Sequence, residues 1–104
     1  MSQKAIFSLF IPARREILKL LLRTGKLSYK GISEALGMDE HKVLFHCGEM
    51  ENQGLLYSTM SQIHENENRL YRCFEVDQKA LFRLILEVRR TTLEILELME
   101  PCQC

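Results

Sequence analysis

Residues 27–56 read LSYKGISEALGMDEHKVLFHCGEMENQGLL, and this stretch decides the fold. A short amphipathic segment, Ser28 to Leu36, ends at Gly37, and a second helical segment follows from Glu40 to Gln53. Gly54 then ends the second helix and opens an extended stretch. The order of helix, tight turn, helix, glycine and strand is typical of a helix-turn-helix that continues into a β-wing. Such a unit can place its second helix, the recognition helix, in a DNA major groove.

Polar residues mark the start of both helices. We expect Ser28 to cap the first helix and Asp39 to cap the second, because a side-chain oxygen can accept hydrogen bonds from the free N–H groups of the first turn. Apolar residues recur at three- and four-residue spacing along the second helix and predict its buried face. They are Val43, Leu44, Cys47 and Met50.

The chain before this stretch predicts two more helices. An apolar segment at residues 6–11 forms the first. Pro12 suits the first turn of the second because it has no N–H to leave unpaired, and this helix continues to Thr24. Gly25 is a natural residue just beyond a helix end.

The chain after it predicts a wing and a long helix. Residues 55–63 and 69–76 are rich in Tyr, Leu, Ile and Val and predict strands, joined by a polar turn at 64–68. A helix follows from residue 78 to 100 and ends at Pro101. The sequence therefore predicts a mainly α fold with a two-stranded β-wing. We expect a single winged-helix domain over residues 1–104, with the helix-turn-helix at about 28–53, the wing at about 55–76 and a dimerisation helix at about 78–100.

A 3.5-residue apolar seam along the last helix indicates a helix–helix interface. Its positions are Leu81, Ile85, Val88, Thr92, Ile95 and Met99. Thr92 is the weak point because it is polar. Within one chain, Ile6, Phe7 and Phe10 can cover only part of this stripe. We therefore predict a homodimer whose interface contains the seam together with Phe7 and Phe10.

The composition describes a globular chain without charge bias. Hydrophobic residues make up 46% and charged residues 27%, and fourteen Lys and Arg balance fourteen Asp and Glu. No apolar run approaches the roughly 18 residues that span a bilayer. The start lacks a signal-peptide cleavage site, so we expect a cytoplasmic protein with no membrane partner. No phosphate loop or nucleophile–base arrangement appears, so we expect neither enzyme activity nor a cofactor.

The charges are unevenly placed along the chain. Residues 1–30 hold seven bases and one acid, whereas residues 31–68 hold one base, Lys42, and seven acids. A surface that meets DNA phosphates should be basic, so the acidic segment argues against DNA unless the recognition helix separates its charges by face. We expect its N-terminal half to present outward-facing residues to the bases. These are His41, Lys42, Phe45 and His46. The alternative is a solvated face with no partner.

Other residues suit contacts to the DNA backbone. Tyr29 and Lys30 begin the first helix of the helix-turn-helix, where the positive helix end also favours a phosphate. Arg69 and Arg72 flank Tyr71 on the second strand and could reach the minor groove or the backbone. They could equally be edge-strand arginines that discourage sheet pairing. Phe45 could contact a thymine methyl or serve only in packing.

This arrangement resembles the arsenic-repressor (ArsR-type) winged-helix family from about Leu9 to Val76. The segment PARREILKLLLRTGKLSYKGISEALGM, residues 12–38, is similar to the family's first two core helices. The family's glycine, apolar, histidine, apolar, glycine and leucine positions are filled in order. The residues are Gly37, Val43, His46, Met50, Gly54 and Leu55. The resemblance implies a homodimer, paired through its first and last helices, that binds a roughly palindromic operator.

The metal sites of metal-sensing family members are missing. Their Cys-x-Cys-type motif is replaced by residues 27–30, which contain no thiol, and the predicted last helix contains no His. Cys102 and Cys104 could bind a soft metal or form a redox-sensitive disulfide, or be an incidental tail. We predict no metal site. His46 is expected to bond a neighbouring backbone group rather than a ligand, and Cys47 to be a small core residue.

The sequence thus predicts a homodimeric, sequence-specific transcriptional regulator that binds double-stranded DNA. The alternative is a winged-helix protein-interaction module whose acidic surface meets a basic partner and which does not bind DNA. Steep salt dependence of duplex binding would favour the first interpretation.

Overall fold

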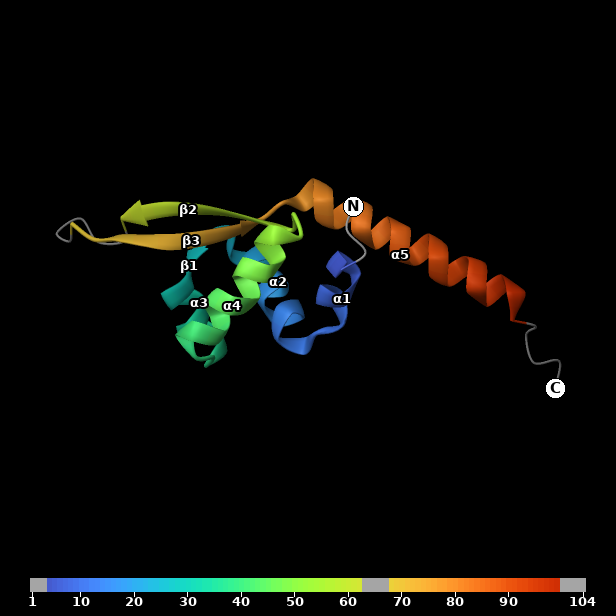
Figure 1. Ribbon diagram of the computed structural model, residues 1–104, viewed down its shortest axis with the longest axis horizontal. Helices are drawn as coiled ribbons and strands as arrows, with labels where there is room; N and C mark the ends of the chain where they lie inside the picture. Colours follow the sequence, from blue (N-terminus) through green and yellow to red (C-terminus); the bar gives the residue numbers. More distant parts are fainter. Residues whose placement is uncertain (1–3, 63–67, 100–104) are drawn as a thin grey trace.

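The computed structural model describes residues 4–62 and 68–99. Five helices and three strands follow one another along this part of the chain (Figure 1). They are α1 (Lys4–Phe10), α2 (Pro12–Thr24), β1 (Leu27–Ser28), α3 (Tyr29–Leu36), α4 (Glu40–Asn52), β2 (Leu56–Gln62), β3 (Leu70–Val76) and α5 (Gln78–Leu98).

The predicted winged helix-turn-helix is confirmed, with one more strand than expected. The wing is a three-stranded antiparallel sheet in the order β1-β3-β2. Strands β2 and β3 pair from Leu56 opposite Val76 to Gln62 opposite Leu70. The additional strand β1 pairs Leu27 with Phe74 and Ser28 with Cys73. The sequence did not reveal β1 because a two-residue strand has no alternation to detect.

The turn between α3 and α4 follows the expected chemistry. Gly37 adopts a left-handed conformation with φ of 63°, and the Met38 N–H donates to the Ser33 carbonyl at 3.1 Å. The Gly37 N–H donates to the same carbonyl, so two N–H groups close the end of α3. The Asp39 carboxylate then accepts from the N–H groups of His41 at 2.8 Å and Lys42 at 3.3 Å. The predicted cap at Asp39 is confirmed, and it fixes the direction in which α4 leaves the turn.

The predicted cap at Ser28 is also confirmed, since its hydroxyl accepts from the Gly31 N–H at 3.0 Å. At the other end of α4, Gly54 has φ of 81°, a conformation that side chains other than glycine rarely adopt. The Leu55 N–H turns back to the Met50 carbonyl at 2.9 Å. The N–H groups of Gln53, Gly54 and Leu55 are therefore all paired where the chain passes from α4 into the wing.

One hydrophobic core joins the helices to the sheet. Its fully buried side chains come from α2, α3, α4, the β2 junction, β3 and α5. They include Ile17, Leu21, Ile32, Val43, Met50, Leu55, Phe74 and Leu84. The core holds α4 by one face only, so its opposite face is free to meet another molecule.

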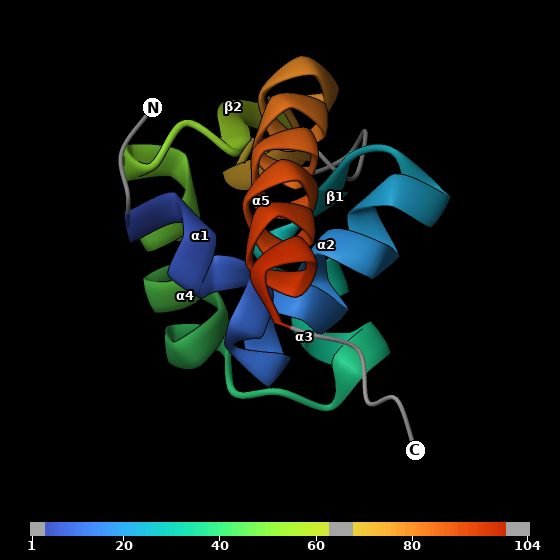
Figure 2. The same cartoon turned by 90° about the vertical axis from the view of Figure 1, so that its right-hand side faces the viewer.

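Helix α5 leaves the body of the molecule. Figure 1 shows it projecting away from the wing, and Figure 2 views it nearly end-on in front of the other helices. The described part of the chain measures 66 by 25 by 21 Å along its principal axes, which reflects the outward course of the wing and α5. Among the described residues, no helix is both long and apolar enough to cross a membrane.

The structure separates the predicted seam into two parts. Leu81 is buried in the core of its own chain and Val88 packs against that core, which corrects the assignment of Leu81 to an interface. The other seam residues are exposed: Ile85, Thr92, Ile95 and Met99. The Thr92 hydroxyl donates to the Val88 carbonyl at 2.8 Å, so its polar group is satisfied within the helix.

The expected cover of the seam within one chain also differs. Ile6 and Leu9 of α1 pack on the core, whereas Phe7 and Phe10 point outward and are each 63% exposed. Two predictions lie outside the described residues: most of the 64–68 turn, and the pair Cys102 and Cys104.

Candidate nucleic-acid interface

The N-terminal half of α4 presents the side chains that the sequence assigned to DNA. His41, Lys42 and Phe45 are exposed, with Phe45 exposed by 52%, and His46 is half-buried. Val43 and Cys47 on the opposite face are fully buried. The two faces are separated in this way because apolar residues recur at helical spacing along α4.

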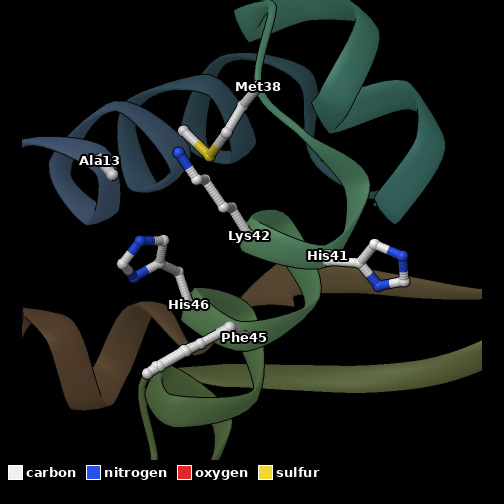
Figure 3. A pocket seen from close by; sticks show the side chains of 6 residues that line it. All are labelled: Ala13, Met38, His41, Lys42, Phe45 and His46. Carbon is white, nitrogen blue, oxygen red and sulfur yellow. The ribbon is translucent and has the colours of Figure 1, made fainter.

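An open pocket of about 630 Å³ lies between α4 and the start of α2. Its lining residues are Ala13, Met38, His41, Lys42, Phe45 and His46. In Figure 3, Lys42 extends beside Met38, His46 turns toward the side of α2 on which Ala13 lies, and His41 points away from the others. The lining contains basic, aromatic and apolar side chains but no carboxylate. Such a surface offers donors and apolar contacts to base edges.

His46 is held by a side chain that the sequence reading missed. The Arg14 Nε–H donates to His46 Nδ1 at 3.1 Å, so the predicted backbone partner is replaced by Arg14 of α2. The Arg14 guanidinium also lies 5.9 Å from the centre of the Phe45 ring. Arg14 precedes Ile17 and Leu18 by three and four residues, so it lies on the apolar face of α2. That spacing was the available signal that Arg14 is buried.

The surroundings of His46 favour its neutral form. Burial is the largest cause that lowers its pKa below the ordinary value of 6.5, followed by the positive charges of Arg14 and Lys42, while Glu49 acts in the opposite direction. A neutral imidazole with Nδ1 as acceptor carries its proton on Nε2. His46 is therefore suited to accept from Arg14, and a proton on Nδ1 would end that bond.

A second group of predicted contacts gathers around Tyr71 of β3. The Lys30 ammonium lies 5.2 Å and the Arg69 guanidinium 5.1 Å from the centre of the Tyr71 ring. The Tyr29 ring lies 6.4 Å from the same centre, tilted by 45°. We call Tyr29, Lys30, Arg69 and Tyr71 the Tyr71 cluster. Its two cations come from separate parts of the chain, α3 and the residue before β3, which only the folded chain brings together.

Arg72 differs from its predicted role. Its guanidinium forms a salt bridge with Glu51 of α4 and lies 5.0 Å from the centre of the Phe74 ring. The Ser58 hydroxyl donates to the same carboxylate, and this bond is the main reason that the pKa of Glu51 is lowered, with Arg72 adding to it. Arg72 therefore joins the wing to α4 and is not a free arginine on the wing.

The described thiols are not suited to sensing. Cys47 is fully buried, and burial raises its pKa to about 12, so its reactive thiolate form is suppressed. Cys73 is also buried. Within residues 4–62 and 68–99, no group of three or more His, Cys, Asp or Glu side chains could hold a metal ion.

One family profile and several solved structures are similar to this chain. Residues 12–57 match the sequence profile of a family described as winged helix-turn-helix DNA-binding. These residues run from the start of α2 to the first residues of the wing, and include both the turn and α4. The chain is similar to that family over these residues, where its own fold is a winged helix-turn-helix. No curated protein is similar enough in sequence to count as a match.

Solved structures with the same fold include named ArsR-family proteins. An ArsR family transcriptional regulator, RHA00566, has a TM-score of 0.66 and 20% identity, and the match covers 93% of this chain and 97% of that one. The antimony-specific transcriptional repressor AntR has a TM-score of 0.63 and 18% identity, with 91% and 78% covered. Mb0332 from Mycobacterium bovis has a homodimeric winged helix-turn-helix DNA-binding domain, a TM-score of 0.60 and 20% identity, with 94% and 84% covered. The predicted resemblance to ArsR-type winged-helix proteins is confirmed at the level of the fold.

Proposed function

We propose that this chain is a sequence-specific, DNA-binding transcriptional regulator of the ArsR type that acts as a homodimer. Residues 1–104 would form one winged-helix domain, and the partner would be double-stranded DNA in the cytoplasm. The observation that carries this proposal is the N-terminal half of α4, where His41, Lys42 and Phe45 are exposed. These three residues line an open pocket, and no carboxylate is among its lining residues.

The Tyr71 cluster supports the same proposal from the other side of the helix-turn-helix. Phosphate contacts position a protein on duplex DNA, and basic side chains at a helix start and on a wing are suited to make them. Lys30 and Arg69 supply two such charges at neighbouring positions. Although the chain as a whole is neutral, this surface is locally basic.

The exposed apolar surface of α5 supports the homodimer. Ile85, Ile95 and Met99 are exposed on one side of a helix that projects from the body. Phe7 and Phe10 add apolar surface on α1. A second copy related by a two-fold axis could bury both sets at once, because such an interface uses the same residues from each chain. Mb0332, which has the same fold, is homodimeric, and this also supports the proposal.

Selection of bound sequences from a pool of random duplexes at moderate salt tests the function. We expect a roughly palindromic consensus, because a two-fold dimer presents two identical α4 helices to the DNA. Binding should weaken steeply with salt as phosphate contacts are screened.

Acidic side chains on α4 favour a different function. Glu40 and Glu49 are exposed, and they would oppose an approach to phosphates. If the selection returns no enriched duplex and duplex affinity is negligible even at low salt, the helix-turn-helix instead serves as a protein-interaction module with a basic partner. Binding to a basic protein that duplex DNA does not compete for would support that alternative.

A further inference from the structure

A cluster centred on the buried Arg14 side chain joins three helices behind the proposed reading surface. It consists of Ser8 of α1, Arg14 of α2, Phe45 and His46 of α4, and Gln53, the residue that follows α4; we call it the Arg14 cluster. Arg14 donates from Nη1 to the Ser8 hydroxyl at 3.1 Å and from Nε to His46 at 3.1 Å. The Ser8 hydroxyl in turn donates to the Gln53 side-chain oxygen. Two elements that precede α4 therefore bond it near its middle and at the residue just beyond its C-terminal end.

The Arg14 cluster holds a charge in an unusual setting. Arg14 is only 7% exposed, and among the described residues no carboxylate forms a salt bridge with it. A buried cation is tolerated only when acceptors or aromatic faces replace its hydration. Ser8, His46 and the Phe45 ring do this here. Because each partner is needed, the positions of the His46 and Phe45 side chains are tightly constrained.

We propose that Arg14 is a positioning residue for base recognition: it holds Phe45 and His46, and with them the N-terminal half of α4, in the orientation that meets DNA. This inference rests on the proposed function. Ser8 extends the same constraint to α1. Phe7 and Phe10 of the same helix are exposed.

Burial separates this role from a direct DNA contact. Ser8 is fully buried and Arg14 nearly so, whereas Phe45, with which Arg14 interacts, is exposed by 52%. The rings of Phe45 and His46 lie 5.3 Å apart, so a shift of one displaces the other. Any effect of Arg14 on sequence preference must therefore act through α4. A loss of phosphate contact, by contrast, would weaken binding to all sequences.

The bond from Arg14 requires an acceptor at His46. Neutral imidazole provides one at Nδ1, and an asparagine at this position would place its side-chain oxygen near the same point. The charged groups that act on His46 are Arg14 from α2, and Lys42 and Glu49 from its own helix. Asparagine should therefore preserve the cluster, while a leucine of similar bulk should break it.

The first experiment compares Arg14→Lys with Arg23→Lys, an exposed arginine on the same helix. Affinity is measured for the duplex selected by the wild-type protein and for a scrambled duplex. We expect Arg14→Lys to weaken selected-duplex binding by about tenfold or more, on the scale of one lost base contact. In Arg14→Lys, the affinity for the scrambled duplex and the salt slope should stay unchanged. Arg23→Lys should not alter the ratio of the affinities for the selected and scrambled duplexes. Equal losses on both duplexes, or an unchanged ratio for Arg14→Lys, would overturn the proposal.

The second experiment tests the acceptor and covers the case in which Arg14→Lys does not fold. His46→Leu should lower the ratio of selected to scrambled binding by about tenfold, and His46→Asn, which keeps an acceptor, should lower it much less. If His46→Asn and His46→Leu lose the ratio equally, His46 acts on the bases directly and the positioning role is wrong.

The third experiment needs no DNA. Amide hydrogen exchange of the free protein should show faster exchange in the N-terminal half of α4 for His46→Leu than for the wild type, with α3 unchanged. Unchanged exchange in α4 would contradict the proposal even if the wild-type protein binds DNA. If the wild-type protein selects no duplex but His46→Leu speeds amide exchange in α4, the proposed function is wrong, while the conclusion that the Arg14 cluster holds α4 in place is retained.

Discussion

Single residues on this surface have different roles because their surroundings differ. Lys42 is exposed on α4 and lines the open pocket, whereas the Lys30 ammonium lies against the Tyr71 ring beside Arg69. A side chain at a groove-facing helix can distinguish bases, while a cation beside the helix start can serve only to hold phosphate. The two lysines therefore predict different binding defects.

Lys42→Ala should weaken binding to the selected duplex by about 1–3 kcal/mol and relax specificity at one position, as loss of a base contact does. Lys30→Ala should weaken all duplexes alike and flatten the salt slope by about one unit, as loss of a phosphate contact does. Titrations of selected and scrambled duplexes over a range of salt would measure both effects. Arg72→Ala is a useful comparison: because Arg72 is paired with Glu51, its loss should affect mainly stability, by about 1 kcal/mol or less. If neither lysine variant alters duplex binding, α4 does not face DNA.

His46 predicts a pH dependence of folding. Its pKa is lowered in the folded protein, so the unfolded chain takes up a proton more readily than the folded one. The contribution of His46 to the free energy of unfolding is therefore fully present above the ordinary pKa of 6.5. It falls as the pH drops through 6.5 toward the lowered pKa of the folded protein. Urea denaturation of the wild type and of His46→Asn between about pH 8 and pH 5 would measure it. The difference in unfolding free energy between the two proteins should shift in favour of His46→Asn on acidification. A difference that does not change with pH would contradict this account.

At the scale of elements, the helix-turn-helix depends on backbone groups that specific side chains satisfy. Asp39 accepts two N–H groups of the first turn of α4, and Gly37 allows the chain to turn before it. The wing depends in a comparable way on the junction at Gly54 and on the Arg72–Glu51 pair. These local bonds set the angle at which α4 and the wing leave the core.

Asp39→Ala should reduce the free energy of unfolding by about 0.5–2 kcal/mol, because the first turn of α4 loses its acceptor. Asp39→Asn keeps a side-chain oxygen and should lose much less. Equilibrium denaturation in urea, with the slope compared among the three proteins, would measure the change. If alanine and asparagine are equally destabilising, the effect comes from the negative charge near the helix N-terminus rather than from the hydrogen bonds.

At the scale of the whole molecule, the main feature is the exposed apolar surface of α5. Leu81 and Leu84 are buried near its start, but beyond them the apolar residues of α5 are mostly exposed. Leu98 is 84% exposed. An extended apolar surface of this kind on a folded chain marks an interaction site.

Ile85→Asp should convert a dimer into a monomer at about micromolar concentration, because a carboxylate would be buried without a partner in the interface. Since Ile85 is exposed within its own chain, the fold should persist, as circular dichroism would show. Glu87→Lys changes an exposed residue outside the seam and serves as the control. Sedimentation velocity measures the assembly. A wild-type protein that sediments as a monomer at this concentration would contradict the homodimer.

The sequence by itself determined the order of the five helices and the two long strands, and the ends of the central helices. Ser28, Asp39 and Gly54 act on backbone groups within a few residues of themselves, so their effects can be derived from local spacing. The separation of α4 into a buried and an exposed face also followed from its apolar repeat. Lys42 and Phe45 were therefore placed on the exposed face without knowledge of the fold.

Only the tertiary structure decided which distant side chains meet. Arg14 and His46 are 32 positions apart, and Arg72 and Glu51 are 21 positions apart. Strand β1 exists because Leu27 and Ser28 lie beside β3, not because of their own pattern. Leu81 is buried in the core, whereas Ile85 is exposed. Both residues belong to the same apolar repeat of α5, so only the packing of that helix distinguishes them. Burial and long-range bonds depend on how elements pack, and this packing is a property of the whole chain that local periodicity does not contain.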